Sequence, residues 1–258
     1  MQRSSRSEEM PRDFVDSLNL GYESQLHSCI LTANQLGFSE IWISNLTKEE
    51  KSFLSQSSFE SLIRIYERLD IGLNNESKAQ MVSILRQRRR EIPIVAVSCL
   101  SPELTAWAAQ DNRVDILKFP VFQLGKLMSR SIAKLMIKFQ KHLEIPLSEL
   151  YALPERQQIP ALRQIRSALE IATRKGVPIL FSSGSRRLDQ MRSPREITAL
   201  GQMLLASSAP PLDSLSNIPQ RLLQKNLLKI SENYISPGVY KVTTTLQQST
   251  TLEEDEEE

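Results

Sequence analysis

Short apolar segments alternate with amphipathic segments along most of the chain, and this alternation predicts the secondary structure. The apolar segments are six to eight residues long, and several are rich in β-branched residues, as is typical of strands buried on both faces. They lie at residues 14–20, 40–45, 92–99, 114–119, 142–147 and 177–183. A weaker strand candidate, with the sequence LDIGL, lies at 69–73.

Apolar residues recur every three or four positions between these segments, which predicts helices. The predicted helices span residues 23–37, 59–68, 77–90, 101–110, 124–140 and 160–175. Strands and helices that alternate without hairpin signals indicate a parallel sheet. With a weaker eighth strand at 234–242, the pattern predicts a TIM-like (β/α) barrel of seven to eight parallel strands with an irregular last unit.

We predict a single domain at 13–242 of the 258 residues. A barrel of this kind takes about 250 residues, so one domain fits this length. Residues 1–12 lack periodicity, and residues 243–258 are polar and end in the acidic run EEDEEE, so we expect both segments to be disordered. The two cysteines, Cys29 and Cys99, are interpreted as buried reduced thiols. Since neither a signal peptide nor an apolar run of about 18 residues is visible, we expect a cytoplasmic protein without a membrane span.

Positive charge is concentrated in the middle of the chain. Residues 86–195 contain 20 Lys or Arg and 9 Asp or Glu, a net charge of +11, whereas the formal charge of the whole chain is only +2. The segments before residue 86 and after residue 195 are both acidic. A cationic excess of this size favours binding to a polyanion, although a solvated helix face explains any single charge run equally well.

The sequence GVPILFSSGSRR at residues 176–187 places small residues and positive charge directly after an apolar strand. The ends of parallel barrel strands carry the binding loops, and Ser183 and Gly184 allow backbone amides to approach a ligand closely. Residues 193–196 form a capping box with Ser193 as N-cap, which begins a helix. Arginines around this helix start predict a phosphate site, the alternative being a well-capped helix with exposed arginines. These arginines are Arg186, Arg187, Arg192 and Arg195.

The predicted helix at 124–140 carries a cationic stripe, because a basic residue recurs at every fourth position. The stripe consists of Lys126, Arg130, Lys134 and Lys138. Like charges at this spacing repel by roughly a few tenths of a kcal/mol per pair, so an anionic partner would stabilise the stripe. A third basic cluster precedes the strand at 92–99 and contains Arg86, Arg88, Arg89 and Arg90.

No recognisable catalytic motif is present. The two histidines, His27 and His142, do not stand in the HxH or HExxH pairs of metal hydrolases. Asp115 and Glu144 lie in strand patterns, but nothing in the sequence brings these carboxylates together. G-x-S-x-G, G-x-G-x-x-G and Walker motifs are also missing. We therefore predict no catalytic residue, no metal ligand and no cofactor bound by the chain itself.

The segment at 177–196 resembles the signature of the ribonuclease P protein family that includes archaeal component 3 and the eukaryotic thirty-kilodalton subunit. The family pattern is an apolar strand, Ser-Ser-Gly, a variable stretch and Arg-Ser-Pro-Arg-Glu, which here correspond to 182–184 and 192–196. Weaker matches follow the family order over about 13–242, whereas residues 40–80 match poorly. The weaker matches are FVDSLNL (14–20, with Asp16 at the acidic position), RVDILKFP (113–120, with Lys118 in place of a small residue), HLEIPLSEL (142–150) and YISPGV (234–239).

The resemblance implies a PHP-like barrel, related to metal-dependent phosphoesterases but without their metal ligands. It implies a protein subunit of ribonuclease P, the RNA-based endonuclease that removes the 5′ leader of precursor tRNA. Cleavage then belongs to the RNA and its Mg²⁺, and the partners are ribonuclease P RNA, precursor tRNA and a protein subunit of the component 2 type.

The RNA-binding residues predicted from the basic clusters and the signature segment fall into three groups. They are Arg88, Arg89, Arg90 and Lys118; Lys126, Arg130, Lys134 and Lys138; and Ser183, Gly184, Arg186, Arg187, Arg192, Ser193 and Arg195. Two other functions remain as alternatives. One is an active metal-dependent barrel phosphoesterase that uses Asp16 or Glu144, and the other is a protein-interaction scaffold that does not bind RNA.

Overall fold

Seven parallel strands form one sheet in the order β1-β2-β3-β4-β5-β6-β7. The computed structural model describes residues 13–20, 25–73, 76–205, 212–231, 234–236 and 239–240. The strands are β1 Val15–Leu18, β2 Glu40–Ser44, β3 Arg64–Ile71, β4 Ile94–Ser98, β5 Ile116–Lys118, β6 His142–Pro146 and β7 Ile179–Ser182. The expected disordered segments, 1–12 and 243–258, lie outside the described residues.

The sheet curls until its first and last strands meet. Just beyond β7, the backbone N–H of Gly184 donates to the carbonyl of Ser17 at 3.0 Å, and the N–H of Asn19 donates to the carbonyl of Ser185 at 2.9 Å. A parallel bridge between Leu18 and Ser185 lies between these bonds. The predicted TIM-like barrel is therefore confirmed as a nearly closed barrel of seven strands.

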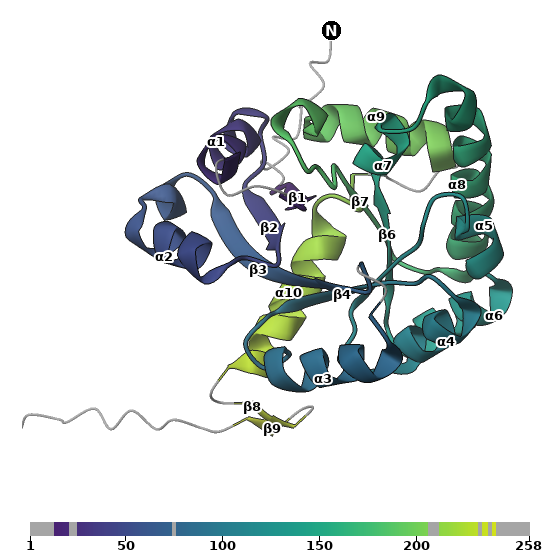
Figure 1. The fold of residues 1–258 in the computed structure, drawn as a ribbon, viewed down its shortest axis with the longest axis horizontal. Helices are drawn as coiled ribbons and strands as arrows, with labels where there is room; N and C mark the ends of the chain where they lie inside the picture. Colours follow the sequence, from purple (N-terminus) through teal and green to yellow (C-terminus); the bar gives the residue numbers. More distant parts are fainter. Residues whose placement is uncertain are drawn as a thin grey trace, which may run out of the picture.

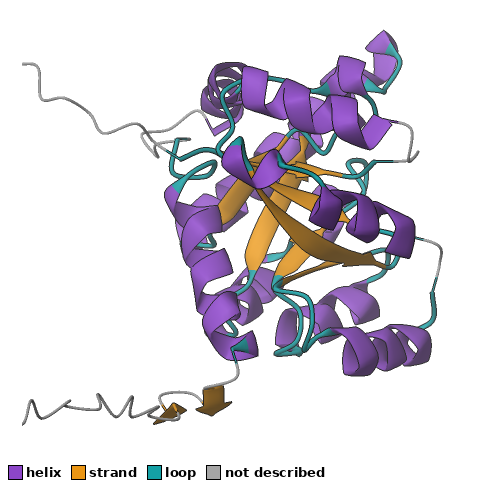
Figure 2. Ribbon diagram, turned by 90° about the vertical axis from the view of Figure 1, so that its left-hand side faces the viewer, coloured by secondary structure: helices purple, strands orange, loops and turns teal. Residues whose placement is uncertain are grey.

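Helices surround the strands on the outside (Figures 1 and 2). They are α1 Leu26–Gln35, α2 Lys48–Gln56, α3 Lys78–Arg88, α4 Pro102–Gln110, α5 Leu124–Leu127, α6 Arg130–Lys138, α7 Leu147–Tyr151, α8 Glu155–Lys175, α9 Pro194–Leu205 and α10 Asn217–Ile230. The larger hydrophobic core lies between the outward faces of the strands and the inward faces of these helices, and it includes Cys29 and Cys99 as free thiols. Both cysteines are buried, as predicted.

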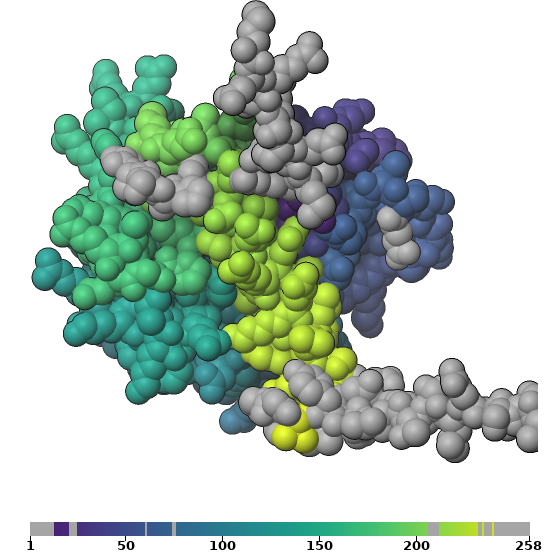
Figure 3. Space-filling view, turned by 180° about the vertical axis from the view of Figure 1, so that it is seen from behind, coloured from purple at the N-terminus to yellow at the C-terminus, as the bar shows by residue number. Residues whose placement is uncertain are grey.

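A second hydrophobic core fills the inside of the barrel and is closed by α10. Leu222 and Leu223 of this helix pack with residues that begin strands, among them Val15, Ile94 and Ile116. Because these residues lie at the amino ends of β1, β4 and β5, α10 covers the amino end of the barrel. Figure 3 shows the helix running across the side of the molecule that faces away in Figure 1.

The helix predicted at 59–68 is wrong. Residues 59–61 form a single 3-10 turn, the preceding helix is α2, and the third strand begins at Arg64. Along this strand Ile65 and Leu69 face the outer core, whereas Tyr66 packs into the barrel interior. Arg68 also faces inward, where it bonds to residues of other strands. Because charged residues that face inward interrupt the apolar run, the hydrophobic pattern did not predict this strand over its full length.

Two further predictions need correction. The helix at 124–140 is divided into α5 and α6, because Met128 leaves the helical conformation (φ −79°, ψ 73°) and Ser129 caps α6 by accepting from the N–H of Ile132 at 3.2 Å. The segment at 234–242 does not supply an eighth barrel strand. Its described residues form β8 Tyr234–Ser236 and β9 Val239–Tyr240, an antiparallel pair separate from the barrel sheet.

Candidate functional site

A buried network of charges fills the inside of the barrel at the carboxyl ends of the strands, where barrel enzymes carry their active sites. Arg68 on β3 is only 1% exposed. Its Nε donates to Asp70 at 2.7 Å, and its two terminal nitrogens each donate to one carboxylate oxygen of Glu144 on β6. Nη1 also donates to the hydroxyl of Ser17 on β1 at 2.8 Å. One guanidinium thus ties together three strands.

The same two carboxylates have further donors. Lys118 on β5 pairs with Asp70 at 3.3 Å, and the hydroxyl of Ser44 donates to the same Asp70 oxygen at 2.9 Å. The hydroxyl of Ser182 on β7 donates to Glu144 at 2.7 Å. Two cations therefore neutralise two carboxylates, and the remaining lone pairs are taken up by hydroxyls.

The pairing with Arg68 and Lys118 keeps the two carboxylates of this network, Asp70 and Glu144, ionised. Burial alone raises the pKa of Asp70, but the adjacent Arg68 and Lys118 lower it to about 2. The pKa of Glu144 is likewise lowered against its burial by Arg68. A general acid or base works best with a pKa near the operating pH, and no group of three or more metal-binding side chains occurs in the described part of the chain. Arg68 and Lys118 thus lie beside both carboxylates at the carboxyl-end mouth of the barrel.

The Ser-Ser-Gly segment closes the barrel rather than facing a ligand. Asp16 on β1 accepts from the backbone N–H of Ser183 at 2.7 Å and from its hydroxyl, which joins the first and last strands. Burial raises the pKa of Asp16 to about 6, although the bonds from Ser183 act in the opposite direction. Gly184 has φ +59°, and a Cβ at this position would lie 2.5 Å from Cβ of Pro146. A direct RNA contact does not fit Ser183, because its side chain is fully buried.

The arginines after this segment lie on the carboxyl-end rim, around the start of α9. Arg186, Arg187 and Arg195 are exposed, and Arg187 pairs with Asp189 at 3.1 Å. Arg192 is half-buried and stacks over the ring of Tyr151 at 4.9 Å from its centroid. Among the described residues, Arg186 and Arg195 are exposed without a salt bridge, whereas Arg187 is paired and Arg192 is half-buried.

The predicted capping box is confirmed at the same helix start. The hydroxyl of Ser193 accepts from the N–H of Glu196 at 3.3 Å, and the Glu196 carboxylate accepts from the N–H of Ser193 at 2.8 Å. The hydroxyl also donates to that carboxylate at 2.8 Å. Ser193 is therefore engaged in holding the helix start in place.

The other predicted RNA-binding residues are divided between the outer wall and the amino end of the barrel. Arg130, Lys134 and Lys138 are exposed along α6, while Lys126 is exposed on the separate helix α5. The predicted stripe therefore contains three residues on one helix instead of four. A direct RNA contact also does not fit Lys118, which is 8% exposed and paired inside the barrel.

The arginines at the end of α3 lie at the amino end, where that helix leads into β4. Arg88 pairs with Glu67 at 2.8 Å, and Arg89 pairs with Asp115 at 3.2 Å. Arg90 is exposed, with no salt bridge among the described residues. The amino end of the barrel therefore carries positive charge, of which the sequence analysis identified only this cluster of arginines.

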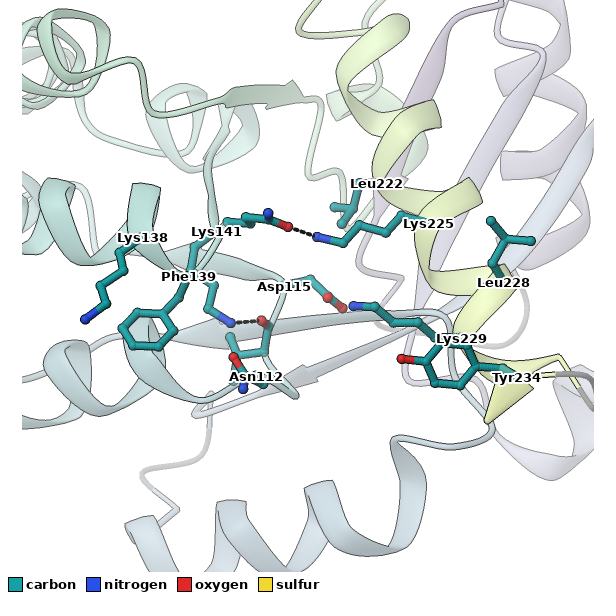
Figure 4. A pocket seen from close by; sticks show the side chains of 12 residues that line it. Asn112, Asp115, Lys138, Phe139, Lys141, Leu222, Lys225, Leu228, Lys229 and Tyr234 are labelled. Atoms are coloured by element: carbon teal, nitrogen blue, oxygen red, sulfur yellow. Dashed lines mark hydrogen bonds between the residues drawn. The ribbon is translucent and has the colours of Figure 1, made fainter. Parts of the chain in front are cut away.

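A basic surface at the amino end was missed in the sequence. Two adjoining cavities beside α10, of about 690 and 520 Å³, share Asn112, Lys229 and Tyr234. Figure 4 shows the first of them. We call them the amino-end groove, whose lining includes Arg89, Arg90, Asn112, Lys138, Lys225 and Lys229. Arg221, Lys225 and Lys229 recur every fourth residue in a helix that contains no acidic residue. The sequence analysis did not identify this basic pattern, because the acidic tail gives the segment after residue 195 a net negative charge.

The family model for the RNase P subunit p30 matches residues 15–231 of the chain. The chain belongs to this family. Ribonuclease P protein component 3 of Methanococcoides burtonii is 24% identical over 232 residues, covering 88% of this chain and 93% of the relative. The corresponding protein of Halobacterium salinarum is 27% identical over 155 residues, covering 60% and 66%.

Solved structures agree with this fold. A chain in the cryo-EM structure of archaeal ribonuclease P with mature tRNA superposes with a TM-score of 0.74 at 16% identity, covering 91% of this chain and 99% of that chain. A Burkholderia multivorans amidohydrolase with bound zinc has a TM-score of 0.53 at 12% identity, covering 82% and 99%. At these identities the likeness concerns the fold alone. None of the helices in the described residues is long and apolar enough to cross a bilayer.

Proposed function

We propose that this chain is a protein subunit of ribonuclease P that binds and stabilises the enzyme's RNA during removal of the 5′ leader from precursor tRNA. The observation that carries the proposal is the family match, which runs from the first strand to the end of α10. The cationic surfaces on the rim, on α6 and at the amino end support it, because phosphate neutralisation dominates affinity for nucleic acids.

The subunit itself does not break the phosphodiester bond. Of the two carboxylates named for a barrel phosphoesterase, Glu144 is paired with Arg68, and Asp16 accepts hydrogen bonds from Ser183. From the family resemblance we propose that Mg²⁺ and the reacting groups belong to the RNA component. The family resemblance further supports a second protein subunit of the component 2 type as a partner, and a cytoplasmic location.

The proposal is tested by identifying the RNA that co-purifies with the tagged full-length chain from its own host at moderate salt. We expect ribonuclease P RNA and precursor tRNA to be enriched over total RNA. Recovery of a protein partner with no enriched RNA would instead favour a scaffold.

The phosphoesterase alternative is tested with the isolated chain in Mn²⁺ or Zn²⁺. We expect no hydrolysis of nucleic acid or of a phosphate ester. A hydrolytic activity that survives purification and is abolished by Asp16→Ala or Glu144→Ala would contradict the proposal.

A further inference from the structure

The amino-end groove concentrates positive charge to an extent that its surroundings do not neutralise. Seven cationic side chains line it, and Asp115 is its single carboxylate among the described residues. That carboxylate already pairs with Arg89 at 3.2 Å. No salt bridge pairs Lys138, Lys225 or Lys229 with a carboxylate in the part of the chain that the structure describes. Arg113 also pairs with Asp111 at 2.6 Å, and Lys141 is buried. Four of the seven cations therefore have no salt bridge among the described residues, namely Arg90, Lys138, Lys225 and Lys229.

Neighbouring cations in the groove lie close enough to affect each other's protonation. Burial lowers the pKa of Lys229, and the adjacent Lys225 and Arg89 lower it further, whereas the nearby Asp115 carboxylate acts in the opposite direction. Burial also lowers the pKa of Lys141 to about 8, and its Nζ donates to the carbonyls of Asp111 and Val114. Figure 4 shows Lys225 and Lys229 reaching from α10, Lys229 toward Asp115, which directly precedes β5. A polyanion in this space would relieve the mutual repulsion.

Aromatic rings lie among these cations. Phe139 and Tyr234 line the same cavity, and Nζ of Lys138 lies 5.5 Å from the centroid of the Phe139 ring. The lining also includes the apolar side chains of Leu222 and Leu228. Proteins bind single-stranded RNA with this combination, in which cations track the phosphates and rings stack on splayed bases, whereas double-stranded RNA is read mainly by shape along its backbone.

We propose that the amino-end groove binds an unpaired segment of RNA. Lys138, Lys225 and Lys229 contact its phosphates, and the rings of Phe139 and Tyr234 provide stacking surfaces for its bases. The inference rests on the proposed function and deepens it, because it assigns one RNA-binding surface to the end of the barrel opposite the signature segment.

The charge component is tested by salt-dependent binding of the full-length chain to a fluorescent oligouridylate and to ribonuclease P RNA. The double variant Lys225→Gln/Lys229→Gln is expected to flatten the slope of log K against log[salt] for the oligouridylate by about 1.4, since each single-strand phosphate contact contributes about 0.7. The matched control, Arg163→Gln/Arg166→Gln, removes two exposed charges from α8. It is expected to leave the slope unchanged.

The stacking component is tested with Phe139→Leu, which keeps an apolar side chain but removes the ring. Loss of a stacked base is expected to weaken oligouridylate binding roughly 5- to 150-fold, with the melting temperature measured in parallel to show that the variant is folded. A duplex of the same length is expected to bind more weakly than the single strand.

Three results would overturn the inference while leaving the proposed function intact, provided that the wild-type chain binds ribonuclease P RNA. The first is an unchanged slope in the variant Lys225→Gln/Lys229→Gln. The second is tighter binding of the duplex than of the single strand. The third is that the same variant loses binding to a component 2-type protein while its RNA binding is unaffected. Failure of the wild-type chain to bind ribonuclease P RNA at all would refute the proposed function as well.

Discussion

Replacement of Arg68 by Met tests the inference that the barrel mouth is a self-neutralised charge network. In the native protein the guanidinium is 1% exposed and compensates Asp70 and Glu144, both of which are buried. Removal of one partner of a buried ion pair costs about 3–5 kcal/mol, because the remaining charge is left without compensation. Total stabilities are about 5–15 kcal/mol, so we expect a folded protein whose free energy of unfolding is lower by about 3–5 kcal/mol near neutral pH.

The loss should depend on pH in a definite direction. The pKa of Asp70 in the native protein is about 2, below its unfolded value of about 4, so this carboxylate stabilises the native protein above about pH 4 and less as the pH falls toward 2. Without Arg68, burial dominates and raises the pKa of both carboxylates above their unfolded values. The variant is then penalised most at neutral pH, and its difference from the native protein shrinks as the pH falls.

The assay is urea unfolding of both proteins at several pH values between about 4 and 7, followed by far-UV circular dichroism. Arg174→Met is the control, because Arg174 pairs with Glu170 on the surface of α8, where the two side chains are 71% and 59% exposed, and exposed pairs contribute about 0–1 kcal/mol. Adding Glu144→Gln to Arg68→Met should recover part of the loss. A deficit below about 1 kcal/mol, or one that is constant over this pH range, would refute the reasoning.

Three further predictions follow from single sites. Burial lowers the pKa of His142 to about 4, so its NMR ring signals should stay in the neutral form well below the ordinary value of about 6.5, and its contribution to stability should be lost as the pH falls from about 6.5 toward 4. Ser193→Ala removes the helix cap and should cost about 1 kcal/mol in thermal unfolding. Gly184→Ala should lower the free energy of unfolding by about 1–2 kcal/mol because of the left-handed backbone. The overlap with Pro146 should lower it by about 1–3 kcal/mol more. Gly176→Ala, with φ +75° and nothing near its Cβ position, should show only the first of these costs; equal losses at the two glycines would contradict the assignment.

Continuous apolar runs and capping chemistry were read correctly from the sequence, because each depends on neighbours along the chain. The run at 92–99 became β4, since a strand covered on both faces needs apolar residues at every position. Ser101 caps α4, and Pro102 is its first helical residue, as predicted. The capping box at Ser193 likewise required only local information.

Features that depend on contacts between distant segments were not predictable. Arg68 was placed in a predicted helix and Asp70 in a weak strand candidate, and nothing along the sequence brings Glu144, on another strand, beside them. The amino-end groove is assembled from residues 89–90, 112–115, 138–141, 222–231 and 234, which only the closed barrel brings together. In the sequence, α10 shows an amphipathic basic pattern, but nothing indicates which surface it faces.

Reconstituted processing of precursor tRNA tests the central claim most directly. The measurement compares the cleavage rate of the catalytic RNA and its other protein subunits in Mg²⁺ with and without the full-length chain, and also of the chain alone. We predict that the chain increases the rate or the thermal range of 5′ leader removal and has no activity alone. Cleavage by the chain without RNA, or an identical rate in its presence and absence, would contradict the account.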